Sequence, residues 1–216
     1  MAGFIGAEHQ FHDPEFVRDW ALRFAPTPPR LELFGLILAK LAEPGLPVPH
    51  IVELGIGPGY MARHILERTE AFSYEGVDFS DAMFGIARKT IGDLMGRVTL
   101  TSADLLDPGW TERLSTQPGA IISTWALHDL GSEQAIANVY TACHGALPDG
   151  GVLINGDFIK PDGTAFEYEP GRISVGRHLE LLKAAGFEHP ECLALLETNI
   201  EEPTPANNYA CLFATR

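Results

Sequence analysis

Three acidic residues lie in, or at the end of, short apolar runs that are typical of buried strands. Glu53 lies in the run HIVEL, Asp78 ends YEGVD, and Asp104 ends RVTLTSAD. The carboxyl ends of parallel strands meet at one edge of a sheet, so we expect the three carboxylates at a single site. There Glu53 could attract an ammonium group, Asp78 could accept hydrogen bonds from both hydroxyls of a ribose, and Asp104 could meet the exocyclic amine of adenine. A ligand with ribose, adenine and ammonium but no phosphate fits all three.

A glycine-rich turn follows the first of these runs. Gly55, Gly57 and Gly59 are spaced G-x-G-x-G, and glycines at such a turn allow positive φ angles and close approach of a ligand to the backbone. A dinucleotide-binding loop needs G-x-G-x-x-G, with the pyrophosphate on the helix N-terminus. Pro58 removes one amide donor that a phosphate would want, and Glu53 would repel a pyrophosphate. The turn therefore favours the phosphate-free ligand over NAD.

The elements that must position these groups alternate regularly from His50 onward. The predicted strands are 50–54, 74–78, 97–104, 120–127, 151–158, 192–197 and 208–215, and the predicted amphipathic stretches between them are 61–68, 81–90, 110–114, 132–147 and 174–185. Alternation of strands and helices is typical of a parallel sheet covered on both faces. The last two strands have no helix between them, which predicts an antiparallel pair. We expect an α/β fold: a doubly wound, mostly parallel, seven-stranded Rossmann-like sheet whose last strand is reversed.

Together these motifs resemble the class I S-adenosylmethionine-dependent methyltransferases. The resemblance covers residues 50–216 and rests on four segments in order: VELGIGPG, GVDFSDAMFGIAR, SADLLD and LPDGGVLI. It implies S-adenosylmethionine as the cofactor and S-adenosylhomocysteine as the product. The cofactor-binding residues that follow from it are Glu53, Gly55, Gly57, Gly59, Asp78, Phe79, Met83, Asp104, Leu105 and Thr124. Alternatively, the acids are surface charges or helix caps, as Asp81 is expected to be for its helix.

The segment that leaves the fourth strand contains a candidate catalytic base. Residues 123–130, STWALHDL, resemble the Leu-His-Asp-Trp block of small-molecule O-methyltransferases of the plant caffeate type. In that family the histidine deprotonates a phenolic hydroxyl, and His128 matches it. The unperturbed pKa of histidine, about 6.5, leaves much of it neutral near pH 7. Asp157 falls where the family keeps an acidic residue beside the base. Leu130 stands where the family has tryptophan, so a role for His128 as a hydrogen-bonding wall of the pocket stays open.

The first 49 residues are predicted to form a helical lid or extension that precedes the methyltransferase domain of residues 50–216. One interpretation is that this segment folds across the cofactor site. The aromatic residues of such a lid would be Phe4, Phe11, Phe16 and Trp20. The other is that most of the rings around Phe16, Trp20 and Phe24 pack against the outer helices of the sheet, which we favour. Candidate substrate contacts are Phe11, Trp20, Trp125 and Tyr168.

Charge and motif content exclude several kinds of partner. The chain has 15 Lys+Arg and 29 Asp+Glu, a formal net charge of −14, and no basic cluster, which argues against nucleic acids and anionic membranes. The histidines and acids show no metal-ligand spacing, so no metal is expected. The N-terminus does not resemble a signal peptide, and no stretch approaches the ~18 apolar residues of a membrane span. These features predict a cytoplasmic protein.

The sequence therefore predicts an enzyme that moves a methyl group from S-adenosylmethionine to an O or N atom of a small-molecule acceptor, acting as a monomer or homodimer. His128 would be its general base. Two alternatives stay open: an NAD-dependent oxidoreductase, and a noncatalytic methyltransferase-like binding module.

Overall fold

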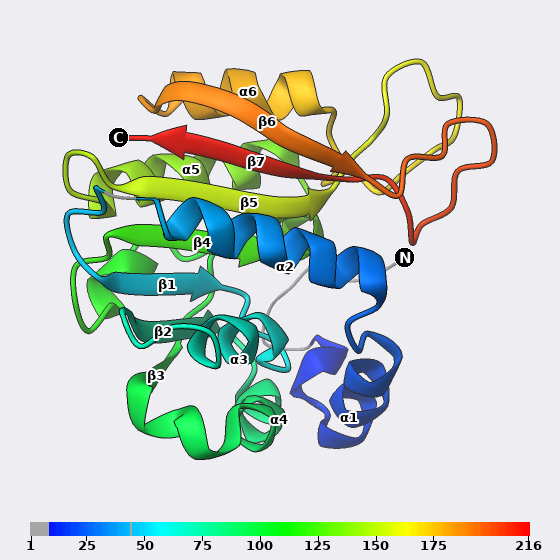
Figure 1. Ribbon diagram of the computed structural model, residues 1–216. Helices are drawn as coiled ribbons and strands as arrows, with labels where there is room; N and C mark the ends of the chain where they lie inside the picture. The colour runs from blue at the N-terminus through cyan, green and yellow to red at the C-terminus, as the bar shows by residue number, and fades with distance from the viewer. Residues whose placement is uncertain (1–8, 44) are drawn as a thin grey trace.

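A seven-stranded sheet forms the centre of the computed structural model, which describes residues 9–43 and 45–216 (Figure 1). The strands are β1 (His50–Leu54), β2 (Ser73–Asp78), β3 (Val98–Ser102), β4 (Ala120–Thr124), β5 (Val152–Phe158), β6 (Glu188–Leu196) and β7 (Tyr209–Thr215). Their order is β3-β2-β1-β4-β5-β7-β6. The pairs among β1 to β5 are parallel, and β7 is antiparallel to both of its neighbours. The predicted doubly wound sheet with a reversed last strand is confirmed.

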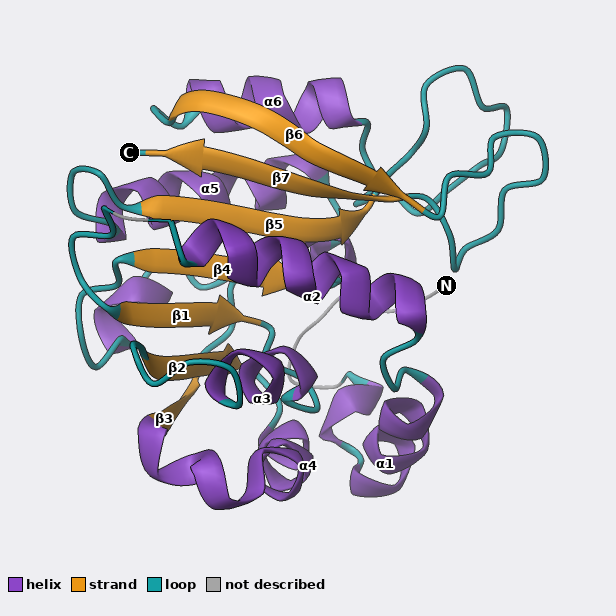
Figure 2. Ribbon diagram, viewed as in Figure 1, coloured by secondary structure: helices purple, strands orange, loops and turns teal. Residues whose placement is uncertain are grey.

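Helices cover both faces of the sheet (Figure 2). The α-helices are α1 (Pro14–Arg23), α2 (Pro28–Leu41), α3 (Tyr60–Leu66), α4 (Asp81–Ile91), α5 (Glu133–Ala146) and α6 (Val175–Ala184). One apolar cluster joins α2, α3 and α4 to the sheet, and a second joins α5 and α6 to the other face. Ile51 belongs to the first cluster and Val52 to the second, because alternate residues of a strand point to opposite faces. Within the residues described, none of the helices is long and apolar enough to cross a membrane.

Several predicted boundaries differ from the observed ones. The fourth strand stops at Thr124 instead of continuing to residue 127, because Trp125 turns with a φ of +49° and the 3-10 helix η4 (Leu127–Leu130) follows. The amphipathic stretch at 110–114 is only a 3-10 turn, η3 (Trp110–Arg113). The expectation that Asp81 caps its helix is wrong. Ser80 is the N-cap, and its side chain accepts a hydrogen bond from the amide of Met83 at 3.1 Å.

The two N-terminal helices occupy different places. α2 packs on the sheet through Leu33, Phe34 and Ile37, which are buried. By contrast, α1 and the preceding 3-10 helix η1 (Gln10–His12) lie against α4, beyond the carboxyl ends of β1 and β2 (Figure 1). Phe4, which the sequence suggested for a lid, lies outside the described residues. The segment that leads into the sheet is therefore next to the edge where a doubly wound fold binds its ligand.

Candidate active site

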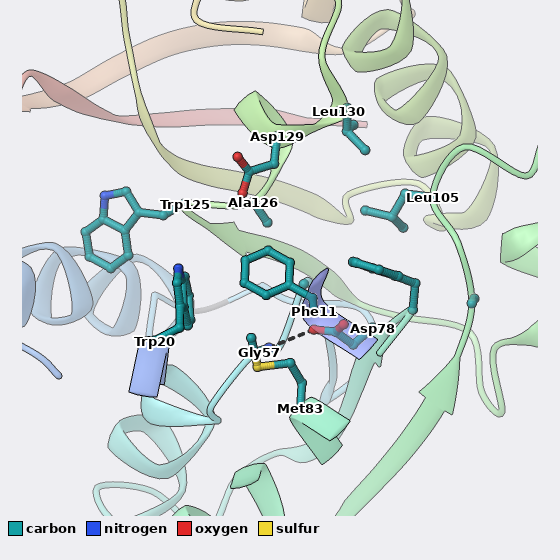
Figure 3. A pocket seen from close by; sticks show the side chains of 13 residues that line it. Phe11, Trp20, Gly57, Asp78, Met83, Leu105, Trp125, Ala126, Asp129 and Leu130 are labelled. Carbon is teal, nitrogen blue, oxygen red and sulfur yellow. Dashed lines mark hydrogen bonds between the residues drawn. The ribbon is translucent and has the colours of Figure 1, made fainter. Parts of the chain in front are cut away.

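Two adjoining cavities open at the carboxyl ends of the central strands. The larger has a volume of about 770 Å³ and is bordered by His128 and Asp129. The smaller, about 70 Å³, is bordered by Asp78 (Figure 3). The residues common to both linings are Phe11, Trp20, Gly55, Gly57, Trp125 and Asp129. Because they share a wall, the two cavities form one site with a small end and a large end.

The glycine-rich turn, residues 55–59, uses its backbone amides for its own fold. Pro58 has no N–H, and each of the other four residues donates to an acceptor within the protein. Gly55 and Ile56 donate to the carbonyl of Val77 at 2.8 and 3.0 Å, Gly57 to Oδ2 of Asp78 at 2.9 Å, and Gly59 to the carbonyl of Ile56 at 2.9 Å. A pyrophosphate needs free amide donors at this point of the fold. The turn offers it none, which counts against a dinucleotide ligand.

Gly55 occupies a position that only glycine fits. Its φ is +67°, and a Cβ there would come within 2.5 Å of Cβ of Ala126. The φ angles of Gly57 and Gly59 are +49° and +78°, so the predicted positive φ angles of the turn are confirmed. Gly55 and Gly57 line both cavities, whereas Gly59 is the N-cap of α3 and lines neither.

Asp78 borders the smaller cavity from the end of β2. Its Oδ2 accepts the amide of Gly57, and its Oδ1 accepts the amide of Ser80 at 3.0 Å. Burial raises the pKa of Asp78 to about 6, although hydrogen bonds from backbone amides and the charge of His12 act in the opposite direction. Asp78 is therefore largely ionised at neutral pH, with both oxygens anchored at the cavity.

Three of the four residues predicted beside the nucleoside lie near Asp78. Phe79, Met83 and Leu105 line the smaller cavity (Figure 3). Asp104 lines neither cavity, and its Oδ1 accepts the amide of Leu106 at 2.9 Å. In this structure the end of β3 thus presents the side chain of Leu105, and not that of Asp104, to the site.

The ring of Phe11 reaches into the smaller cavity from η1 (Figure 3). Its carbonyl accepts the hydroxyl of Ser80, and its ring lies 5.2 Å from that of Trp20, 5.6 Å from Phe16 and 6.4 Å from Phe79. A volume of about 70 Å³ holds a few water molecules but no nucleoside. The ring of Phe11 therefore fills space beside Asp78 that a nucleoside would need.

Glu53 lies on the wall of the larger cavity. Its Oε2 accepts the hydroxyl of Tyr74 at 2.7 Å, and its Oε1 accepts that of Thr124 at 3.5 Å. Burial raises the pKa of Glu53 to about 8, a shift that both hydrogen bonds reduce and the charge of Asp78 increases. At pH 7 the group is mostly protonated, and a cation placed beside it would favour its ionised form.

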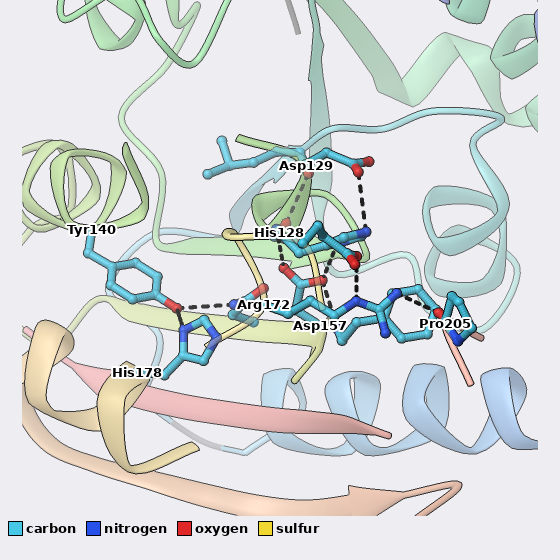
Figure 4. Close-up of polar contacts among 12 residues, drawn as sticks. His128, Asp129, Tyr140, Asp157, Arg172, His178 and Pro205 are labelled. Carbon is cyan, nitrogen blue, oxygen red and sulfur yellow. Dashed lines mark hydrogen bonds and ion pairs between the residues drawn. The ribbon is translucent and has the colours of Figure 1, made fainter. Parts of the chain in front are cut away.

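His128 and Asp157 form a buried pair beside the larger cavity (Figure 4). Nδ1 of His128 lies 2.7 Å from Oδ1 of Asp157, and Nε2 lies 3.3 Å from Oδ1 of Asp129. Burial alone would lower the pKa of His128, but the charge and hydrogen bond of Asp157, with the charge of Asp129, raise it above its usual value. Because Nδ1–H donates to Asp157, Nε2 is the nitrogen left to exchange a proton. Asp157 itself does not line either cavity.

The turn before His128 is strained. Trp125 has a φ of +49° although it is not glycine, and such conformations cluster at functional sites. Its amide donates to the carbonyl of Gly156 at 2.8 Å, which ties the turn to β5. Among the described residues its buried Nε1 has no hydrogen-bond partner. Trp125, a predicted substrate contact, lines both cavities.

Aromatic side chains form most of the larger cavity's apolar wall. They are Phe11, Phe16, Trp20, Phe24, Phe34, Tyr60, Trp125 and Phe158. The expectation that most of the α1 rings pack against the outer helices is wrong, since Phe16, Trp20 and Phe24 all line the cavity. The buried face of α1 consists of Val17 and Ala21. The rings line the site because α1 lies beyond the ends of the strands instead of on the sheet.

Sequence reasoning missed Arg30, Asp129 and Arg172, which also line the larger cavity. Asp129 could have been predicted from the sequence, because it directly follows the candidate base His128. The two arginines could not, because they come from helix α2 and from the loop after β5. Tyr168, a predicted substrate contact, lines neither cavity. Its ring lies 5.3 Å from the guanidinium of Arg172, and its hydroxyl accepts Nδ2 of Asn208 at 3.4 Å.

Comparison with protein families gives one match, in which residues 51–151 match the family described as a methyltransferase domain. These residues run from β1 to the turn before β5 and include the glycine-rich turn, Asp78 and His128. No curated protein matches the chain.

Solved structures share the fold at low sequence identity. "PigF with SAH" has a TM-score of 0.71 and 14% identity over 95% of this chain and 60% of its own. An O-methyltransferase family protein from Burkholderia thailandensis has a TM-score of 0.70 and 19% identity over 97% and 62%. The CurJ carbon methyltransferase has a TM-score of 0.69 and 14% identity over 94% and 58%. The chain thus spans about three fifths of the length of these proteins, and the likeness establishes the fold.

Proposed function

We propose that this chain, whose residues 51–151 match a methyltransferase domain, transfers the methyl group of S-adenosylmethionine to an O or N atom of a small-molecule acceptor. The observation that carries the proposal is the pairing of two buried carboxylates, Glu53 and Asp78, with a glycine-rich turn whose amides are all engaged. Such a site suits a nucleoside with a cationic amino-acid tail and does not suit a pyrophosphate. The structural neighbour whose name includes SAH supports the same cofactor.

The residues around the two cavities fit this cofactor. Asp78 accepts the ribose hydroxyls, and Phe79, Met83 and Leu105 supply apolar surface for the base. Glu53, on the wall of the larger cavity, receives the ammonium group. S-adenosylmethionine supplies a methyl group that is already activated on a sulfonium. The protein's own tasks are therefore to orient the acceptor, to exclude water and to manage one proton.

We assign the exclusion of water to residues 9–24, the part of the predicted N-terminal lid of residues 1–49 that lies beyond the strand ends. Phe11 and Trp20 line both cavities, and the centres of their rings lie 5.2 Å apart. Phe11 withdraws to admit the nucleoside and then covers it, so the lid opens and closes in each cycle. Arrangements of this kind keep water from the reacting atoms.

His128 takes the acceptor's proton on Nε2. Asp157 holds Nδ1–H at 2.7 Å, which fixes the neutral tautomer before transfer and stabilises the imidazolium afterwards. Asp129, 3.3 Å from Nε2, adds to this stabilisation. If the acceptor is already deprotonated, His128 serves as a hydrogen-bonding wall that orients it.

The proposal is tested by incubating the chain with S-adenosylmethionine and a set of phenols, catechols, amines and heterocycles, and by measuring S-adenosylhomocysteine. We expect acceptor-dependent product with at least one of these classes. Cofactor binding without turnover of any acceptor would favour a noncatalytic binding module. The absence of cofactor binding would contradict the proposal altogether.

A further inference from the structure

Arg30 lines the larger cavity, and the proposed reaction does not use it. It lies in the first turn of α2, where its Nη1 donates to the carbonyl of Phe24 at 2.8 Å. Its guanidinium carbon lies 4.9 Å from the centre of the Phe24 ring and 5.1 Å from that of Trp125. The guanidinium of Arg30 thus packs over two rings of the aromatic wall and donates to one carbonyl.

This is an unfavourable place for a cation that makes no ion pair within the described residues. The first turn of a helix carries the positive end of its dipole, which disfavours a nearby positive charge. Burial lowers the pKa of Arg30, while Tyr209 and Glu197 act in the opposite direction. Within the described residues no carboxylate lies within 4.0 Å of the guanidinium. Local costs of this kind are typical of functional sites.

Arg172 offers an internal comparison within the same cavity. It is 5% exposed, its guanidinium carbon lies 4.2 Å from the centre of the Phe158 ring, and its Nε donates to Glu169 at 2.5 Å. The charge of Arg172 is therefore neutralised by a carboxylate of the protein, although its buried Nη1 has no partner among the described residues. Arg30 has an equivalent aromatic contact, but the carboxylate whose charge acts on it, Glu197, forms no ion pair with it.

A row of rings connects Arg30 to the candidate base. The Trp125 ring, against which Arg30 packs, lies 6.4 Å from the ring of Phe158. The ring of Phe158 in turn lies 5.2 Å from that of His128, edge to face. Arg30 and His128 thus border the same cavity and are joined by one aromatic wall.

We propose that Arg30 binds an anionic group of the methyl acceptor, a carboxylate on a flat ring system, and so determines which acceptors the site takes. The inference rests on the proposed function, because it assigns the acceptor to this cavity. A guanidinium matches a carboxylate with two parallel hydrogen bonds, and the ring packs on Trp125 and Phe158. Asp129, which also lines the cavity, repels an anion from the end beside His128 and thereby fixes the acceptor's direction.

Binding measurements with matched acids and esters test this proposal. The probes are 3,4-dihydroxybenzoate and 3-(3,4-dihydroxyphenyl)propanoate, each with its methyl ester, titrated calorimetrically into the chain saturated with S-adenosylhomocysteine. We expect the chain to bind at least one acid about tenfold or more tightly than its ester. Arg30→Met should abolish this preference and leave the affinity for the ester within about twofold of the wild-type value. Arg30→Lys should retain part of the preference, because lysine keeps the positive charge but lacks the paired N–H donors of the guanidinium. Arg88→Met, at an exposed arginine of α4 that lines neither cavity, should change nothing.

Each outcome bears on one claim. Three results would contradict the role of Arg30. The wild-type chain could bind neither acid, it could bind both acids no more tightly than their esters, or the Arg30→Met variant could keep the preference for the acid. Titration of S-adenosylhomocysteine into the same samples separates failure of the Arg30 proposal from failure of the proposed function. Cofactor binding with no acid preference overturns only the Arg30 proposal, whereas a wild-type chain that binds no cofactor overturns the function. Thermal unfolding of each variant establishes that it is folded.

Discussion

Nδ1 of His128 lies 2.7 Å from Oδ1 of Asp157, and Oδ2 of the same carboxylate accepts the backbone amide of His128 at 3.0 Å. The two residues come from different elements, His128 from η4 after β4 and Asp157 from β5. One side chain therefore fixes both the position and the tautomer of the imidazole. The basicity of His128 depends on this carboxylate, and that dependence can be measured.

Turnover should rise with pH through a pKa above 6.5, because the base must be neutral and the pKa of His128 is raised by Asp157 and Asp129 against the effect of burial. Asp157→Asn removes the negative charge while burial remains, so the inflection should move to lower pH and kcat should fall. The measurement is kcat against pH with both substrates saturating. An inflection that stays in place in Asp157→Asn would show that His128 is not the titrating group.

Replacing the base should separate chemistry from binding. His128→Ala should lower turnover by about 10² or more, within the usual range for loss of a general base, and leave the affinity for S-adenosylhomocysteine within a few fold. Steady-state kinetics and calorimetry on the same preparation give both values. Turnover equal to that of the wild type would leave His128 only the role of a pocket wall.

Cofactor binding should release protons at pH 7. Glu53, with a pKa of about 8, holds its proton in the free protein, and an ammonium placed beside it lowers that pKa. Because the bound state holds fewer protons than the free state, the affinity should increase as the pH rises toward 8 and then level off. Calorimetry in buffers of different ionisation enthalpy measures the number of protons released.

Glu53→Gln supplies the matched control for this effect, because glutamine keeps the shape and can still pair with Tyr74. We expect the variant to bind the cofactor more weakly and to lose most of the proton release. Equal proton release in the variant and the wild type would show that Glu53 does not face the ammonium group.

Removing the ring of Phe11 should accelerate cofactor entry. The smaller cavity holds that ring, so Phe11→Ala should raise the association rate constant of S-adenosylhomocysteine and lower kcat through poorer exclusion of water. Stopped-flow fluorescence can follow binding, since Trp20 lies 5.2 Å from Phe11. Leu22→Ala, at a side chain on α1 that is 72% exposed, is the control. An unchanged association rate in Phe11→Ala would argue against a lid that must open.

The sheet and the small end of the site were predictable because their signals are local in the sequence. A buried parallel strand is a short apolar run, and its last residues mark the ligand edge, so Asp78 follows from position. Phe79 and Met83 follow from the resemblance to the class I methyltransferases. Asp104 shows the limit of this reasoning, since a shift of one residue places Leu105 at the cavity instead. The same uncertainty of one residue separates Ser80 from Asp81 as the helix cap.

The parts of the large end formed by Phe16, Phe24 and Arg30 were not predictable, because they depend on where whole elements lie. The periodicity of α1 indicates an apolar face, but it does not say whether the rings of Trp20 and Phe24 cover a sheet or a cavity. The role of Arg30 depends on the rings of Trp125 and Phe24 that flank it. No spacing in the sequence indicates that Arg30 packs on these two rings.

The central claim is that the site binds a phosphate-free nucleoside with a cationic tail. Its most direct test is calorimetric titration of the purified chain with S-adenosylhomocysteine, alone and in the presence of excess NAD, with Asp78→Ala measured alongside. We predict saturable binding that NAD does not displace and that Asp78→Ala weakens by about tenfold or more. No binding by the wild type, displacement by NAD, or unchanged affinity in Asp78→Ala would contradict the account.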